Sequence, residues 1–214
     1  MIMLRGRDAV PGSASIGPVT DVRHAVPADA DALTAALTTA FYHDPVWGPV
    51  FPDESRRAGQ MAAMWRVYAT SALRYPWTFV TPDVEAAAIW IPPDGMELTP
   101  EDVRERDEQL ESAAGPEAAA LTREIEERFE ASHPDGSFFH LTILATHTRH
   151  RGKGLGMSLL AETLTRIDAL GGAAYLESTN PVNDARYRSV GFEPRAAITM
   201  PGGQVVTTMW RPAR

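Results

Sequence analysis

The chain has no cysteine among its 214 residues. That absence excludes disulfide bonds, a thiolate nucleophile and cysteine-ligated metal sites. It also fits a reducing compartment, so we expect a cytoplasmic protein. Long apolar runs are missing too, because the longest, Ala86–Ile91, falls far short of the roughly 20 residues that span a bilayer. We therefore expect no membrane partner.

Positive charge is scarce. The chain has 20 basic and 28 acidic residues, for a net charge of −8. Because binding to a phosphate backbone needs a basic face, we expect no nucleic-acid partner, whereas a small cationic substrate is compatible with this charge. The six histidines show no metal-ligand spacing, so we expect no metal. Lys153 is the only lysine, and it lies in the most distinctive loop of the sequence.

The composition, with 44% hydrophobic and 22% charged residues, is that of a folded domain. Residues 1–18 mix Gly, Pro, Ser and charge without periodicity, so we interpret them as a flexible leader before one domain over 19–214. Apolar periodicity and turn residues predict the elements in this order: strand 20–24, helices 27–42 and 53–73, strands 77–81 and 85–91, helical region 100–131, strand 138–146, helix 153–170, strand 173–177, helix 181–190, strands 196–200 and 205–210.

The segment 92–137 differs from the rest of the chain in its charge. Its helical region carries many Glu and Arg at short spacing and is broken near Gly115 and Pro116. We interpret it as a variable helical insertion with a mainly solvated face. Two roles stay open at this point, since the insertion could cover a substrate cleft or form the surface of a homodimer.

A glycine-rich loop follows the predicted strand 138–146. Its sequence is Arg149-His150-Arg151-Gly152-Lys153-Gly154-Leu155-Gly156-Met157. Three glycines in five residues let a ligand approach the backbone, and the exposed amides lie at the positive end of the following helix. The loop therefore predicts a site for phosphate or pyrophosphate.

Two familiar glycine loops do not fit this spacing. A Walker A loop needs Ser or Thr after Gly-Lys, but Gly154 follows Lys153. The dinucleotide fingerprint G-x-G-x-x-G differs from the spacing of Gly152, Gly154 and Gly156. A nucleotide-binding protein that uses the loop in another way stays an open alternative, as does a strand-to-helix turn without a ligand.

The pattern Arg151-x-x-Gly154-x-Gly156 after a strand resembles the acetyl-coenzyme A loop of the Gcn5-related N-acetyltransferases. Asn180 and then Tyr187-x-x-x-Gly191-Phe192 follow in the order found in that family. Two motifs in the right order are much more specific than either alone. The resemblance is strong over about 138–212, weak over 19–91 and absent over 92–137. The stretch 176–192 most resembles the puromycin-type branch of antibiotic acetyltransferases.

The resemblance implies an α/β fold in a single domain, with a mixed, splayed central sheet of six to seven strands and helices on both faces. It implies acetyl-coenzyme A as co-substrate, and direct transfer of the acetyl group to the primary amine of a small molecule in a ternary complex. Two other functions stay open: acetylation of a peptide or protein amine, and a non-catalytic acyl-coenzyme A sensor.

The cofactor residues follow from matching this sequence to the family motif. The pantetheine arm would pair with the backbone of the strand before the loop, as an added strand does, and the pyrophosphate would lie on the loop amides. Asn180 would contact the arm, although an Asx cap before Pro181 is its alternative role. The implied cofactor-binding residues are Leu144, Ala145, Thr146, Arg151, Gly152, Lys153, Gly154, Leu155, Gly156, Met157, Asn180 and Asn183.

Tyr187 matches the family tyrosine near the thioester sulfur, where it would protonate the leaving thiolate as a general acid. The general base is less defined by the motif. His140 lies where the histone-acetylating branch carries a catalytic glutamate, and Glu177 on the next strand is the other candidate. Packing or a salt bridge is the alternative role of each of these side chains.

The acceptor pocket is expected at the first helix and its exit. An acidic side chain beside aromatic rings suits an organic amine. The candidate substrate-binding residues are Phe41, Tyr42, Asp44, Trp47 and Trp90, each with core packing as its alternative role.

Overall fold

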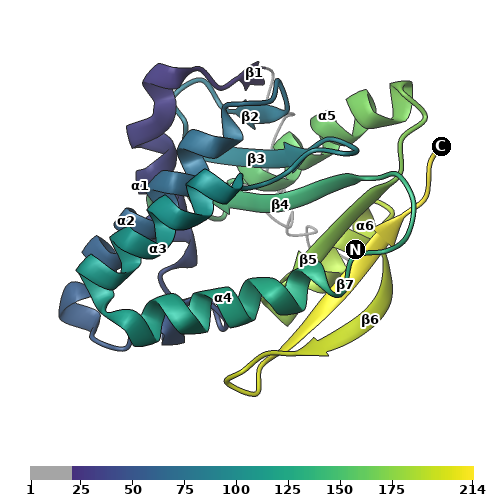
Figure 1. Cartoon of the computed structure of the whole chain (residues 1–214). Coiled ribbons are helices and arrows are strands. Elements are labelled where there is room, and N and C mark those ends of the chain that lie inside the picture. The colour runs from purple at the N-terminus through teal and green to yellow at the C-terminus, as the bar shows by residue number, and fades with distance from the viewer. Residues whose placement is uncertain (1–20) are drawn as a thin grey trace, which may run out of the picture.

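The computed structural model describes residues 21–214 and contains one seven-stranded sheet in the order β1-β2-β3-β4-β5-β7-β6 (Figure 1). β4 and β5 are parallel, and every other neighbouring pair is antiparallel. The strands are β1 (Arg23–His24), β2 (Thr78–Val80), β3 (Ala86–Ile91), β4 (Phe139–Thr146), β5 (Ala174–Ser178), β6 (Glu193–Thr199) and β7 (Val205–Arg211). The predicted mixed sheet is confirmed. The leader 1–18 and the first residue of the predicted strand 20–24 lie outside the described residues.

Helices cover both faces of the sheet, as expected for an α/β domain. The α-helices are α1 (Ala30–Phe41), α2 (Glu54–Ala72), α3 (Pro100–Ala114), α4 (Pro116–Glu130), α5 (Leu155–Ala169) and α6 (Asp184–Ser189). One core lies beneath α5 and contains Trp90 and Leu164, whereas the cores on the other face join α1 and α2 to the sheet. No helix in the described part of the chain is long and apolar enough to cross a bilayer.

The insertion folds into the helical hairpin α3–α4, broken where the sequence predicts. Thr99 caps α3 through a reciprocal pair of hydrogen bonds with Asp102. Gly115 has φ +92°, a backbone conformation that favours glycine, and Pro116 then starts α4. Figure 1 shows α4 running from the α2–α3 side of the molecule toward β7.

Most residues of the insertion are exposed or half-buried, as expected of a mainly solvated face, but one stripe of it is buried. Leu110 and Arg106 are completely buried, and Ile125 is nearly so. Ile125 belongs to one apolar cluster with residues of α2 and with Met200 and Val206 of the β6–β7 hairpin. α4 therefore bridges α2 and the β6–β7 hairpin, and its apolar face is part of the core.

β4 contains a bulge that changes which face of the sheet its odd-numbered side chains point to. Leu141 pairs with Trp90 and Ile143 pairs with Ile89, so Thr142 has no partner in β3. As a result Leu141 packs under α5, but Ile143 packs on the α1–α2 side. A bulge of this kind re-aims a strand at the edge of a site.

The parallel pair β4–β5 separates beyond the bulge. Its register runs through Phe139–Ala174, His140–Tyr175 and Leu141–Leu176 and then stops. β4 continues to Thr146 and β5 to Ser178, but beyond this point the two strands no longer pair with each other. The two strands therefore form a fork that leaves one edge of β4 open, which confirms the predicted splay of the sheet.

Candidate functional site

A cavity of about 1630 Å³ opens between the strands of this fork. It extends from the glycine-rich loop to the α3–α4 hairpin. Its lining residues come from the exit of α1, α2, the start of the insertion, α4, the fork, the glycine-rich loop and the turn into α6. One continuous space thus joins the predicted cofactor loop to the side chains predicted to carry the chemistry.

The glycine loop has the backbone shape that an anion site needs. Gly152 has φ +80° and Gly154 has φ +75°, where Gly154 is the N-cap of α5. A Cβ on Gly156 would lie 2.8 Å from Thr146 Oγ1, so only glycine lets α5 start this close to β4. The first amides of α5 have no acceptor within the helix and point along the positive end of its dipole.

Two basic side chains of the loop have other contacts. Arg151 donates to the backbone oxygen of Ala40 at 2.6 Å, which ties the loop to the end of α1. The Lys153 ammonium lies 3.4 Å from His150 Nδ1, and Lys153 does not border the cavity. The loop would therefore hold a pyrophosphate chiefly through its amides.

The other predicted cofactor residues lie along the fork. Leu144 and Thr146 border the cavity, whereas the Ala145 side chain is buried on the α1–α2 side. The backbone of Ala145 is still part of the β4 edge that β5 leaves unpaired. Asn180 accepts a hydrogen bond from the Val182 amide at 3.3 Å, so it caps the following turn while bordering the cavity.

Tyr187 borders the cavity one turn into α6. Asp184 fixes this short helix, because it accepts hydrogen bonds from Ser178 Oγ at 2.7 Å and Thr207 Oγ1 at 3.2 Å. Burial raises the pKa of Tyr187 to about 12, and the charges of Asp44 and Asp184 act in the same direction. The phenol therefore keeps its proton at neutral pH.

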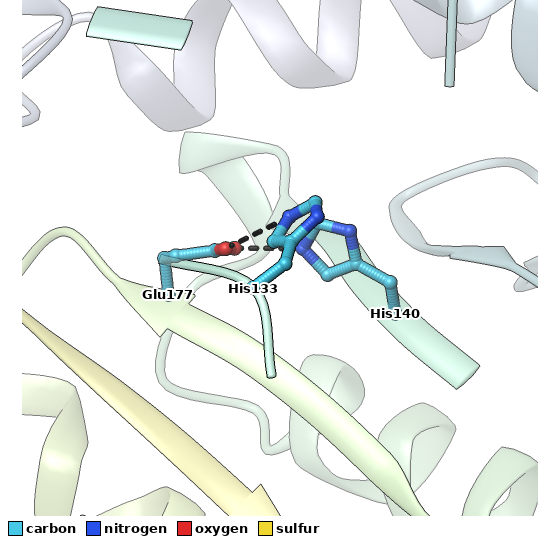
Figure 2. Close-up of side chains that lie close together, drawn as sticks. All are labelled: His133, His140 and Glu177. Carbon is cyan, nitrogen blue, oxygen red and sulfur yellow. Dashed lines mark hydrogen bonds and ion pairs between the residues drawn. The ribbon is translucent and has the colours of Figure 1, made fainter. Parts of the chain in front are cut away.

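The two predicted base candidates lie in contact across the fork's closed end. His140 Nε2 and Glu177 Oε2 are 2.7 Å apart, and the Glu177 side chain is only 7% exposed (Figure 2). Figure 2 also shows His133, from the turn between α4 and β4, with its Nε2 3.4 Å from Glu177 Oε1. A carboxylate held between two imidazoles is the arrangement that orients a histidine base.

Within this group, the charge interactions lower the pKa of Glu177 and raise the pKa of His140. Burial acts to raise the pKa of Glu177, but the neighbouring His140 and His133 lower it to about 2. Burial acts to lower the pKa of His140, but the Glu177 carboxylate outweighs it and the net pKa is raised above its usual 6.5. His140 can therefore accept a proton near neutral pH while Glu177 stays ionised.

The same three side chains place potential metal-ligand atoms within 4.8 Å of one another. His140 Nε2 and Glu177 Oε2 already form a hydrogen bond with each other. The hydrogen bond accounts for this pair without an ion, and the absence of a metal stays a prediction.

Three of the five predicted substrate residues border the cavity, namely Phe41, Asp44 and Trp47. Both carboxylate oxygens of Asp44, however, already accept hydrogen bonds from the protein. Its Oδ1 accepts the amides of Val46 and Trp47, and its Oδ2 accepts from Thr179 Oγ1 at 2.6 Å. Asp44 thus ties the exit of α1 to the end of β5, and its role as a free acid for the amine is not supported.

Two predicted substrate contacts are wrong. Trp90 is completely buried under α5, where its indole N–H donates to Thr163 Oγ1 at 3.1 Å. Tyr42 points away from the cavity, since its hydroxyl donates to the backbone oxygen of Glu54 and Arg57 lies over its ring. Both aromatic side chains are structural.

Sequence reasoning missed the residues that the insertion brings to the cavity. Glu97, before α3, and His133, after α4, border the cavity beside His140. Arg106 and Glu126 form a buried ion pair in its wall, with the Tyr68 hydroxyl 3.2 Å from Arg106 Nη1. The insertion therefore forms one wall of the cavity, which supports its role beside a substrate cleft, while the homodimer surface stays a prediction.

No protein-family model matches the chain. Its structure is similar to several solved acetyltransferases. One from Corynebacterium glutamicum, described as histone acetyltransferase HPA2 and related acetyltransferase, has 24% identity, covers 90% of this chain and 96% of its own, and gives a TM-score of 0.63. Arylalkylamine N-acetyltransferase 2 from Aedes aegypti has 14% identity, coverage of 91% and 99%, and a TM-score of 0.59.

A third structure carries the family name in its description. This acetyltransferase of the GNAT family from Streptococcus agalactiae has 13% identity, coverage of 91% and 95%, and a TM-score of 0.52. These identities are low, but the coverage is nearly complete on both sides. The chain has the fold of the Gcn5-related N-acetyltransferases.

Proposed function

We propose that the chain is an acetyl-coenzyme A-dependent N-acetyltransferase of the Gcn5-related family that acts on a primary amine of a small molecule. One observation carries this proposal: the glycine loop, the open edge of β4, Tyr187 and the His140–Glu177 pair all border one cavity. A pyrophosphate site, an extended-chain site and acid–base groups are the parts that acetyl transfer from a thioester requires.

The residues present fit the cofactor. The close approach of Gly156 to Thr146 keeps the start of α5 beside the open strand edge. The amides from Gly152 to Met157 would hold the pyrophosphate, and β4 from Leu144 to Thr146 would pair with the pantetheine arm. The bound thioester supplies the acetyl group, and a backbone amide of β4 would polarise its carbonyl.

The protein's own groups divide the proton transfers. His140, oriented by Glu177, would take a proton from the ammonium group of the acceptor, so that a neutral amine attacks the thioester carbonyl. Tyr187 would donate its proton to the departing thiolate, since its raised pKa keeps it protonated. No covalent enzyme intermediate is needed, and positioning of the two substrates supplies much of the rate.

A small acceptor is favoured over a peptide because of α4. This helix joins α2 to the β6–β7 hairpin, and Arg128 reinforces the connection by donating to the backbone oxygen of Thr199. An open groove for a peptide would have to cross this bridge. The intact Tyr187 and His140–Glu177 pair also favour an enzyme over a non-catalytic sensor. Amine-bearing antibiotics belong in the substrate screen because 176–192 resembles the puromycin-type branch.

Acetyl-coenzyme A is expected to raise the melting temperature, whereas ATP and NAD are not. At 100 times its dissociation constant a ligand that binds only the folded state stabilises it by about 2.7 kcal/mol. For a domain of this size each kcal/mol corresponds to roughly 2–4 °C. Thermal-shift measurements with the three ligands test this, and equal shifts with all three would contradict the cofactor assignment.

Tyr187→Phe is expected to lower kcat by about 100-fold, at the lower end of general acid catalysis, because a thiolate leaves more easily than most groups. The Kd for acetyl-coenzyme A should change little, since the ring stays in place. Release of free thiol, followed with a saturating amine, gives kcat. A variant with wild-type kcat would rule out Tyr187 as the acid.

A further inference from the structure

Glu97 places a carboxylate in the wall of the cavity, near His140. It follows β3, is half-buried, and forms no ion pair with any residue of 21–214. Its backbone is held in place because the hydroxyl of Ser71 donates to the Glu97 carbonyl oxygen. The side chain is therefore presented to the cavity by a fixed segment rather than by a free loop.

The position of Glu97 follows from the topology of the insertion. β3 and β4 are antiparallel neighbours, and Ile91 at the end of β3 pairs with His140 near the start of β4. The insertion between them must leave and return at this one end of the sheet. Its first turn therefore brings Glu97, and its last turn brings His133, to the His140–Glu177 pair.

The group around Glu97 holds three carboxylates, of Glu97, Glu130 and Glu177, and two imidazoles, of His133 and His140. Glu177 lies beside it, and Glu130 of α4 is within 3.5 Å of His133 Nδ1. Glu177 Oε1 is buried, and its contact with His133 Nε2 is long, at 3.4 Å. The neighbouring arginines do not offset the charge of these carboxylates, because Arg106 and Arg123 are paired with Glu126 and Asp107.

A half-buried carboxylate without an ion pair loses part of its hydration, and a bound cation would offset that cost. Burial raises the pKa of Glu97, and the nearby His140 and Thr142 counter that effect only in part. The cavity wall also has an aromatic part. It contains Phe41, Trp47, Trp65, Tyr68 and Phe129.

We propose that Glu97 binds the ammonium group of the acceptor and that the aromatic wall binds its body, so the substrate is a cationic primary amine with an apolar or aromatic body. This inference rests on the proposed acetyltransferase function and replaces Asp44, whose oxygens are engaged, as the acidic group that recognises the amine. Glu97 would bring the ammonium nitrogen beside His140.

The proton and bond changes balance in this arrangement. The ammonium transfers one proton to His140, the neutral nitrogen forms a bond to the acetyl carbon, and the carbon–sulfur bond breaks. The thiolate gains a proton from Tyr187, and the second proton, lost by the amide nitrogen, passes through solvent and reprotonates Tyr187. One proton per turnover is then released from His140 to solvent.

The test uses 2-phenylethylamine as the probe and 2-phenylethanol as its uncharged analogue. Calorimetric titrations into the full chain saturated with coenzyme A compare the wild type with Glu97→Gln. The amine is expected to bind the variant at least tenfold more weakly, while the alcohol binds both proteins alike. In steady state the KM for the amine should rise by a similar factor, with kcat and the Kd for acetyl-coenzyme A little changed.

Glu105→Gln is the matched control, because Glu105 is an exposed glutamate of α3 outside the cavity. It should behave as the wild type. Equal affinity of the wild type and Glu97→Gln for the amine would overturn the assignment of Glu97, and failure of the wild type to bind the amine would overturn the substrate class. Failure to bind acetyl-coenzyme A would instead refute the proposed function.

Discussion

His140→Gln is expected to lower kcat at neutral pH by about 1000-fold, within the 10²–10⁴ range typical of a general base. The reason is geometric and electrostatic together. His140 is fixed by a 2.7 Å hydrogen bond to a carboxylate that is 7% exposed, and glutamine fills the space without accepting a proton. Thiol release with a saturating amine measures the loss. His24→Gln, on the edge strand β1, is the control and should retain wild-type kcat.

The pH profile distinguishes a base from a packing residue. The base acts when neutral, so wild-type kcat should rise with pH through a midpoint above 6.5, because the pKa of His140 is raised. Glu177→Gln removes the charge that raises this pKa, and the rising limb should move to lower pH. His140→Gln should lose the limb altogether. An unchanged limb in both variants would show that His140 is structural.

The elements of the fold could be predicted because their signals are local. Glycine at Gly154 ends the loop and starts α5, and Gly115–Pro116 breaks the insertion at the predicted place. The predicted hairpin before the insertion is present as β2 and β3. Boundaries differ by a few residues, as expected when the last turn of an element is decided by tertiary contacts.

The roles of single aromatic and acidic residues could not be predicted in the same way. Trp90 and Trp47 are both tryptophans next to apolar residues, yet one lies under α5 and the other borders the cavity. The register between β3 and β4 decides which face of the sheet Trp90 points to, and the local sequence does not determine that register. Asp44 is acidic and near the site, but its hydrogen bond with Thr179, 135 residues away in the sequence, forms only in the folded chain.

The cavity residues that the insertion supplies, Glu97 and His133, were missed for a topological reason. Its charge pattern indicates solvent exposure, and a single sequence does not show which of its arginines is paired inside. One signal was available: two strands that pair as antiparallel neighbours return any insertion between them to the same sheet end. Residues just after 85–91 and just before 138–146, such as Glu97 and His133, could have been placed together on that ground.

Arg106→Ala is expected to lower the free energy of unfolding by about 3–5 kcal/mol, because it breaks a buried ion pair and leaves its partners unpaired. The Arg106 side chain is 1% exposed and contacts Asp107, Glu126 and the Tyr68 hydroxyl. It thereby joins α3 to α2 and α4. The loss corresponds to a fall of roughly 6–20 °C in melting temperature.

Arg104→Ala provides the matched control, since Arg104 is exposed on the same helix. It should change the free energy of unfolding by less than about 0.5 kcal/mol. The double variant Arg106→Met with Glu126→Gln separates charge from packing: it removes the carboxylate that Arg106→Ala leaves buried, so it should recover part of the lost stability. Equal melting temperatures for Arg106→Ala and Arg104→Ala would contradict the view that this ion pair holds the wall of the acceptor cavity in place.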